Sequence, residues 1–91
     1  MMSNFEKFHG NNPHVYERLV GMTQGLLDRG RKRVGMKMLF EVLRWEHFMQ
    51  TEGEPFKLNN NYTAPYARLL EKNQPQWRGV FEKRRAASDD A

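Results

Sequence analysis

The segment Met36–Gln50, MKMLFEVLRWEHFMQ, constrains the fold of this chain more than any other part of the sequence. Apolar or weakly polar residues recur at helical spacing on one face of it, at Met36, Leu39, Phe40, Leu43 and His47. A second apolar face carries Met38, Val42, Trp45 and Met49. A narrow polar stripe of Lys37, Glu41 and Arg44 separates the two. Because a helix that is apolar on two sides is normally buried between other elements, we expect this helix to form the buried centre of the fold.

Three further helices are predicted around this central one. Asn12 and Pro13 form a typical helix start, and apolar residues at helical spacing then predict a helix over 13–28, which Gly30 ends. Pro65 lies in the first turn of a helix that we expect to end near Asn73. A fourth helix is predicted from Pro75. Residues 3–11 favour a short helical turn whose phenylalanines, Phe5 and Phe8, pack on the main body.

These patterns predict an all-α, four-helix single domain over residues 1–91. Its core should span about 12–85, with an N-terminal arm at 1–11 and a flexible tail at 86–91. Strand signal is almost absent, so at most the pieces 31–34 and 56–58 pair as a minimal β-hairpin. The second and third predicted helices have the order of a helix-turn-helix, but residues 51–62 separate them where the simple motif uses about three or four residues. Only a divergent or winged-helix-like variant fits.

The chain has no cysteine, which excludes a disulfide framework, thiolate metal sites and cysteine catalysis and suits a reducing cytoplasm. We expect neither a signal peptide nor a membrane span. Glycine-rich phosphate loops, nucleophile elbows and zinc-protease motifs are also missing. His9, His14 and Glu17 lie near a helix start, but such groupings arise by chance and lack the spacing of metal sites. We therefore predict a protein that is not an enzyme and has no metal or cofactor.

Positive charge is concentrated beside the central helix. Six basic residues and one acidic residue give positions 29–44 a charge of +5, whereas the whole chain carries +4. The basic residues that we single out are Arg31, Lys32, Arg33 and Lys37. A basic connector that leads into a helix N-terminus is suited to phosphate groups, because backbone amides add to the side-chain charge. The alternative is an ordinary solvated turn.

The segment FKLNNNYTAPYARLL, residues 56–70, is the second candidate for contact with nucleic acid. Asparagine pairs bidentately with adenine, and tyrosine, arginine and lysine offer stacking and phosphate contacts. The residues in question are Lys57, Asn59, Asn60, Asn61, Tyr62 and Arg68, together with Tyr66. The alternative is structural: the asparagines build a turn, and Tyr66 and Leu70 belong to the core.

The stretches NPHVYERL, FEVLRWEHF and FKLNNNYTAPYARLL resemble a set of small bacteriophage and prophage proteins of unknown activity, over most of residues 5–85. The resemblance implies a phage origin, and hence the cytoplasm of a bacterial host. It implies no activity and no functional residue. Phage-encoded helical proteins of this size commonly serve as regulators, structural accessories or inhibitors of a host machine.

Two hypotheses for function follow. In the first, the protein binds DNA as a regulatory or accessory factor, with the basic connector on phosphates and the asparagine-rich segment near the groove. In the second, it is a protein-interaction module, either a homodimer or an inhibitor or adaptor that docks on a host complex. The second rests on six Met, six Phe, three Tyr and two Trp in a chain with a small core.

Overall fold

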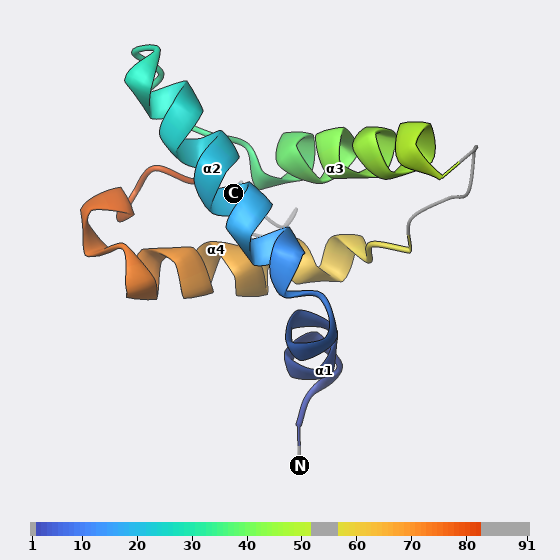
Figure 1. The fold of residues 1–91 in the computed structure, drawn as a ribbon. Helices are drawn as coiled ribbons and strands as arrows, with labels where there is room; N and C mark the ends of the chain where they lie inside the picture. The colour runs from blue at the N-terminus through green and yellow to red at the C-terminus, as the bar shows by residue number, and fades with distance from the viewer. Residues whose placement is uncertain (1, 52–56, 83–91) are drawn as a thin grey trace, which may run out of the picture.

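The computed structural model describes residues 2–51 and 57–82 and folds them into four α-helices, which confirms the all-α, four-helix prediction (Figure 1). The helices are α1 (Asn4–Asn11), α2 (Pro13–Asp28), α3 (Met36–Gln50) and α4 (Thr63–Asn73). Single 3-10 turns lie at Asn60–Tyr62 and Pro75–Trp77. Within the described residues, no helix combines the length and the apolar character that crossing a lipid bilayer requires.

Helix α1 begins with a capping box between Ser3 and Glu6. The Ser3 hydroxyl accepts a hydrogen bond from the Glu6 backbone N–H at 3.1 Å, and the Glu6 carboxylate accepts one from the Ser3 backbone N–H at 2.9 Å. Asn12 then separates α1 from α2. Its side chain donates to the carbonyl oxygen of Phe8 at 2.9 Å and makes no capping hydrogen bond to α2. Asn12 therefore closes the helix before it, while Pro13 starts the helix after it, as predicted.

Helix α2 has the bounds that its periodicity predicts, and Gly30 terminates it with a φ of +91°. In this left-handed conformation, which glycine adopts without strain, the amide groups of Gly30 and Arg31 turn back to the carbonyl oxygens of Leu27 and Leu26. The turn redirects the chain into the connector that precedes α3.

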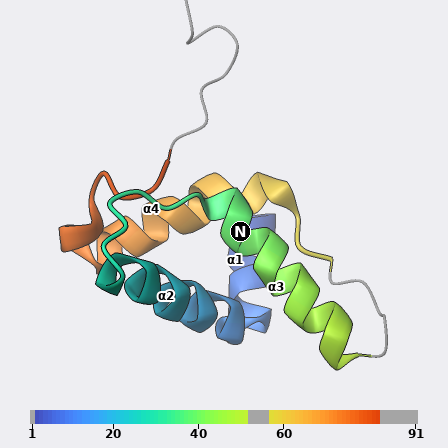
Figure 2. The same cartoon turned by 90° about the horizontal axis from the view of Figure 1, so that it is seen from above.

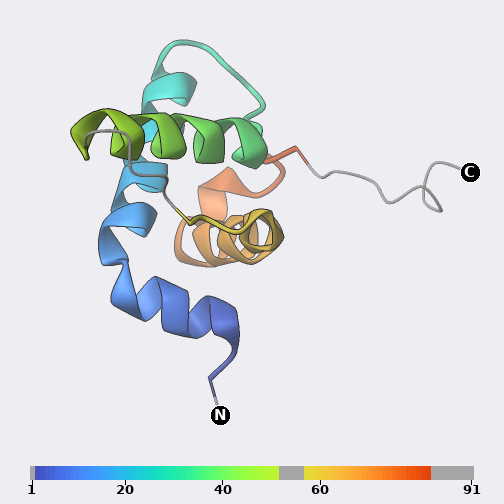
Figure 3. The same cartoon turned by 90° about the vertical axis from the view of Figure 1, so that its right-hand side faces the viewer.

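Helix α3 also has the predicted bounds, but only one of its two apolar faces is buried. Met36, Leu39, Phe40 and Leu43 are at most 5% exposed. The prediction that the second face is buried is wrong. Trp45 and Met49 are 62% and 61% exposed, and Met38 and Val42 are also exposed. The reason is that α2 and α4 pack on the same side of α3, which lies along the edge of the molecule in Figure 2 and above α4 in Figure 3. α3 is a wall of the core and not its centre.

The predicted fourth helix from Pro75 is replaced by the 3-10 turn Pro75–Trp77 and a turn at Gly79, whose φ is +84°. Phe81 then forms a parallel β-bridge with Val34, through hydrogen bonds from Val34 N to Val80 O and from Glu82 N to Val34 O, both 2.9 Å. The predicted pairing of residues 31–34 with residues 56–58 is therefore wrong for Val34, which pairs with Phe81 instead. Part of its second piece, Phe56, lies outside the described residues.

The bridge holds the connector before α3 and the segment after α4 against the same hydrophobic core. Trp77 and Phe81 are 3% and 2% exposed there, beside residues of α2, α3 and α4. Elsewhere on the same core, Phe5 of α1 meets the edge of the Tyr66 ring at a centroid distance of 4.8 Å. The N-terminal segment therefore packs on the body through its phenylalanines, as expected.

Candidate nucleic-acid interface

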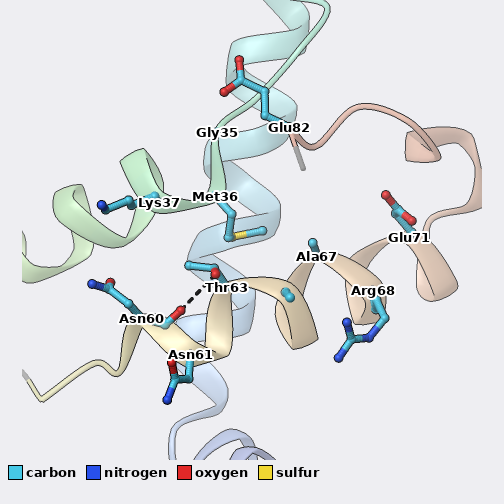
Figure 4. Close-up of a pocket in the computed structure, with 11 residues that line it drawn as sticks. Gly35, Met36, Lys37, Asn60, Asn61, Thr63, Ala67, Arg68, Glu71 and Glu82 are labelled. Carbon is cyan, nitrogen blue, oxygen red and sulfur yellow. Dashed lines mark hydrogen bonds between the residues drawn. The ribbon is translucent and has the colours of Figure 1, made fainter. Parts of the chain in front are cut away.

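A groove of about 930 Å³ lies between the N-terminal end of α3 and helix α4 (Figure 4). It brings together four of the eleven residues singled out from the sequence: Lys37 from α3, and Asn60, Asn61 and Arg68 from the 3-10 turn and α4. Small side chains, Ala64 and Ala67, line it along α4. One basic residue of the first candidate segment and three residues of the second thus line the same concave surface.

The α3 side of the groove is a helix start without a side-chain cap. Gly35 occupies the N-cap position, so the first-turn amides of α3 have no partner from a capping side chain. A carboxylate lies close to this end. Glu82 Oε2 would be 3.2 Å from a Cβ atom at Gly35, which places a negative charge near the positive end of the helix dipole. An anion that binds here meets the backbone amides and Lys37, and it competes with Glu82.

Basic and acidic side chains are both present along the groove. In Figure 4 the side chains of Lys37 and Asn60 extend toward one end, Glu82 lies beside Gly35, and Glu71 lies toward the other end. Arg68 and Asn61 both extend from the α4 segment on the side that faces away from α3 (Figure 4). The donors available to a ligand therefore gather at one end and along the outer side of α4.

The three consecutive asparagines differ in what their side chains do. Asn59 Oδ1 accepts a hydrogen bond from the Asn61 backbone N–H at 2.9 Å, and Asn60 Oδ1 accepts one from the Arg44 guanidinium at 2.7 Å. The Asn59 side chain builds the turn that leads into α4, which confirms the structural alternative for this residue. The Asn60 side chain instead ties the turn to Arg44 of α3. Among the described residues, the Asn61 side chain makes no hydrogen bond that would occupy it. Asn61 is therefore the asparagine best placed to contact a ligand.

Arg44 has a role that sequence reasoning misses. The sequence places it in the polar stripe, where it forms an ion pair with Glu41 at 2.7 Å. Its guanidinium also donates to the carbonyl oxygen of Leu58 and to Asn60, and so holds the segment before α4 against α3. No local pattern could reveal this, because Leu58 and Asn60 are 14 and 16 residues away along the chain.

Three other predicted residues lie outside this groove. Lys57, Asn59 and Tyr62 line a second, shallower hollow beside Phe8 of α1. The Tyr62 ring is half-buried and packs against Phe8 at a centroid distance of 5.1 Å. Tyr62 is thus part of the aromatic packing around α1 and is not presented for base stacking.

Tyr66 is fully buried, which confirms the core alternative for this residue and for Leu70. Burial, with a smaller contribution from Tyr62, raises the pKa of the Tyr66 phenol to about 12. Among the described residues its hydroxyl has no hydrogen-bond partner. Tyr66 therefore cannot reach a ligand on the surface.

Arg31, Lys32 and Arg33 are all exposed on the connector between α2 and α3. The next residues, Val34 and Gly35, anchor that connector in the β-bridge and at the groove. Figure 2 shows the connector running from the C-terminal end of α2 to the start of α3. The basic run therefore lies immediately before the uncapped helix end.

Metal-ligand geometry is not found in the described part of the chain. In residues 2–51 and 57–82, no three His, Cys, Asp or Glu side chains are grouped so that they could hold a metal ion. His9, one of the residues considered for such a site, is stacked on Phe5 at a centroid distance of 6.0 Å.

The chain matches none of the protein-family models, curated proteins or solved structures with which it was compared. The groove must therefore be interpreted from its own chemistry.

Proposed function

We propose that this protein binds DNA as a small regulatory or accessory factor and that it is not an enzyme. The observation that supports the proposal is the groove in which Lys37 of α3 lies with Asn60, Asn61 and Arg68 of the α4 segment. Arg31, Lys32, Arg33 and Lys37 contact phosphates, and the outer side of α4 approaches the bases. The resemblance to phage proteins is compatible with such a role.

The phosphate contacts follow from charge and from the helix start. Lysine and arginine side chains neutralise phosphates, and the first-turn amides of α3 point at whatever occupies the N-terminal end of the groove. Binding of a phosphate near Gly35 displaces the Glu82 carboxylate, so part of the attraction is offset. Affinity then depends on the basic connector as well as on the groove.

The base contacts follow from the surface of α4. Asn61, Ala64 and Arg68 are exposed at intervals of three and four residues, so they share one face of the helix. The small alanine between two side chains with hydrogen-bonding ends allows close approach to base edges in a major groove. In this proposal α3 and α4 form a divergent helix-turn-helix with α4 as the recognition helix.

The test of the phosphate contacts is the salt dependence of binding to a fluorescent duplex DNA, measured by anisotropy from about 50 to about 200 mM salt. The variant R31A/K32A/R33A should bind more weakly than wild type. Its slope of log K against log salt should become shallower by about 0.9 for each phosphate that the variant no longer neutralises. Lys37→Ala should lower affinity in the same way, by the equivalent of one phosphate.

Lys7→Ala is the matched control, because Lys7 is exposed on α1 and its removal changes the net charge by the same amount as Lys37→Ala. Absence of binding at low salt overturns the proposal. So does an equal decrease in affinity in Lys7→Ala and Lys37→Ala, since that would reflect net charge and not a site.

Base contact is tested by selection from a random-sequence duplex pool. Wild-type protein should enrich a motif that contains adenine, and Asn61→Ala should lose that enrichment while its affinity for unselected DNA changes little. Enrichment of the same motif by Asn61→Ala would exclude Asn61 from base recognition.

A further inference from the structure

Five large apolar side chains are exposed together on α3. They are Met38, Val42, Trp45, Phe48 and Met49, and the one other exposed large apolar residue in the described part of the chain is Met2. Trp45 and Phe48 stack on each other with a ring-centroid distance of 6.4 Å and an interplanar angle of 18°. We call these five residues the α3 stripe. Exposed apolar patches that are contiguous in this way mark interaction surfaces more often than single exposed residues do.

The stripe has the spacing of a helix-packing seam. Met38, Val42, Trp45 and Met49 follow one another at intervals of four, three and four residues. This is the repeat with which two helices pack side by side over two heptads, at a crossing angle of about 20°. The seam therefore fits another α-helix better than it fits a flat surface or an extended peptide.

We propose that the stripe is covered by the α3 helix of a second copy of this chain, in an antiparallel, two-fold symmetric dimer. In that arrangement Met38 of one chain lies opposite Met49 of the other, and Val42 lies opposite Trp45. A symmetric dimer needs one self-complementary patch on each chain, and in this pairing the small Val42 faces the large Trp45 while the flexible Met38 faces Met49. The proposal does not rest on DNA binding.

The charges beside the seam are compatible with an uncharged partner surface, such as the same stripe on a second copy. Glu41 is paired with Arg44 at 2.7 Å, and Glu46 is paired with Arg18 of α2 at 2.6 Å. Each carboxylate therefore already has its counter-charge, so the rim does not select a basic or acidic partner. Burial of the seam also leaves neither of these carboxylates unpaired at its edge.

The area is sufficient for a specific dimer. From the exposed fractions of its side chains, the stripe offers about 500 Å² on each chain, and a dimer would bury about 1,000 Å² in total, which is the lower limit for a specific interface. Such a dimer should exchange with monomer at micromolar concentrations.

Electrostatics selects the antiparallel orientation. The basic connector ends at the N-terminus of α3, so parallel packing would bring Arg31, Lys32, Arg33 and Lys37 of both chains together at two positive helix ends. Antiparallel packing separates the two connectors by about the 22 Å length of a 15-residue helix. It also pairs helix ends of opposite sign.

The dimer is tested by sedimentation velocity of the full chain over a range of concentrations. Wild-type protein should show a monomer–dimer equilibrium, and Trp45→Glu should raise the dissociation constant at least about tenfold, because it places a charge in the seam. Met2→Glu is the matched control and should behave as wild type, since Met2 is 53% exposed and lies outside α3. Circular dichroism checks that each variant folds.

A wild-type chain that stays monomeric at all concentrations overturns the proposal, because the α3 stripe is then not covered by a second copy. A dimer that persists in Trp45→Glu, or that is weakened equally in Met2→Glu, also overturns it.

Orientation is tested with single cysteines, which are specific because the natural chain has none. A mixture of the Met38→Cys and Met49→Cys chains should form the mixed disulfide, because these positions face each other in the antiparallel dimer. Each variant alone should cross-link poorly, since the two positions are about 16 Å apart along the helix. Preferential cross-linking of each variant with itself would overturn the antiparallel arrangement.

Discussion

Tyr66 shows how a single side chain can link the core to the pH dependence of stability. Its ring is 0% exposed and contacts the rings of Phe5, His9 and Phe40 at centroid distances between 4.8 and 6.1 Å. The hydroxyl lies among these groups without a hydrogen-bond partner in the described residues. A buried hydroxyl of this kind costs free energy and disfavours ionisation of the phenol.

Tyr66→Phe should therefore leave the free energy of unfolding unchanged or raise it by up to about 1 kcal/mol near neutral pH, because the variant keeps the ring and removes an unpaired hydroxyl. Urea denaturation followed by circular dichroism measures this. A decrease of more than about 1 kcal/mol would show that the hydroxyl is paired in solution.

The alkaline limb of stability should also depend on Tyr66. The pKa of the Tyr66 phenol is raised to about 12 in the folded state and is near 10 in the unfolded state. Between these values the unfolded chain releases the proton and the folded chain keeps it. The free energy of unfolding is therefore unaffected by Tyr66 below pH 10 and decreases as pH rises toward 12. The decrease should reach roughly 2 to 3 kcal/mol in wild type and be absent from Tyr66→Phe. Tyr16→Phe is the control and should retain the decrease, because Tyr16 is not the buried phenol.

At the scale of elements, Arg44 holds the segment before α4 in place. Its guanidinium lies 6.0 Å from the centroid of the Phe40 ring and donates to Glu41, to Asn60 and to the Leu58 carbonyl oxygen. The groove between α3 and α4 depends on that position, since Asn60 and Asn61 line it.

Arg44→Met should destabilise the protein by about 1 to 3 kcal/mol, because the apolar stem is kept while the carbonyl oxygen of the buried Leu58 loses its donor. Arg18→Met removes the same charge and should cost less than about 1 kcal/mol, since its pair with Glu46 is on the surface. Chemical denaturation compares the two. Equal decreases in stability would mean that Arg44 contributes through charge alone.

The helices that the sequence predicts best are those whose bounds are determined by residues close to them in the chain. The bounds of α2 and α3 agree with the prediction because helical periodicity, Pro13 and Gly30 act within a few residues. The exposure of the second face of α3 was not predictable, because its apolar spacing is the same whether this chain or another chain covers it. Periodicity reports that a face is apolar and does not report its partner.

At the scale of the whole molecule, the bridge between Val34 and Phe81 joins segments separated by about half of the chain. It fixes the connector before α3 to the segment after α4, and Phe81 also packs against Trp77 with a centroid distance of 6.4 Å. Glu82, the residue after the bridge, forms part of the groove wall. The last described segment therefore closes both the core and the candidate site.

Phe81→Ala should lower the free energy of unfolding by about 3 to 5 kcal/mol, because it leaves a cavity at a position that is 2% exposed. Val80→Ala is the comparison, and its effect should be clearly smaller since Val80 is only half-buried. Thermal and urea unfolding measure both variants. A similar small effect in each would show that the C-terminal segment is not part of the cooperative core.

The candidate site was predictable in its parts and not in its assembly. Lys37, Asn60, Asn61 and Arg68 stand out in the sequence for their charge and hydrogen-bonding capacity, and the fold brings these four together. Lys57, Asn59 and Tyr62 stand out on the same grounds and lie beside α1 instead. The difference arises from interactions such as those of Arg44 and Phe81, which join residues that are distant in the chain.

The Val34–Phe81 bridge also sets an order of events during synthesis. A ribosome releases the chain from its N-terminus, so α2 and α3 can pair while the residues after α4 are still within the ribosome. The connector can form its β-bridge only when Phe81 has emerged from the ribosome. Glu82, which lines the groove, emerges one residue later. A nascent chain should therefore become helical early and acquire a complete groove only after Phe81 and Glu82 have emerged.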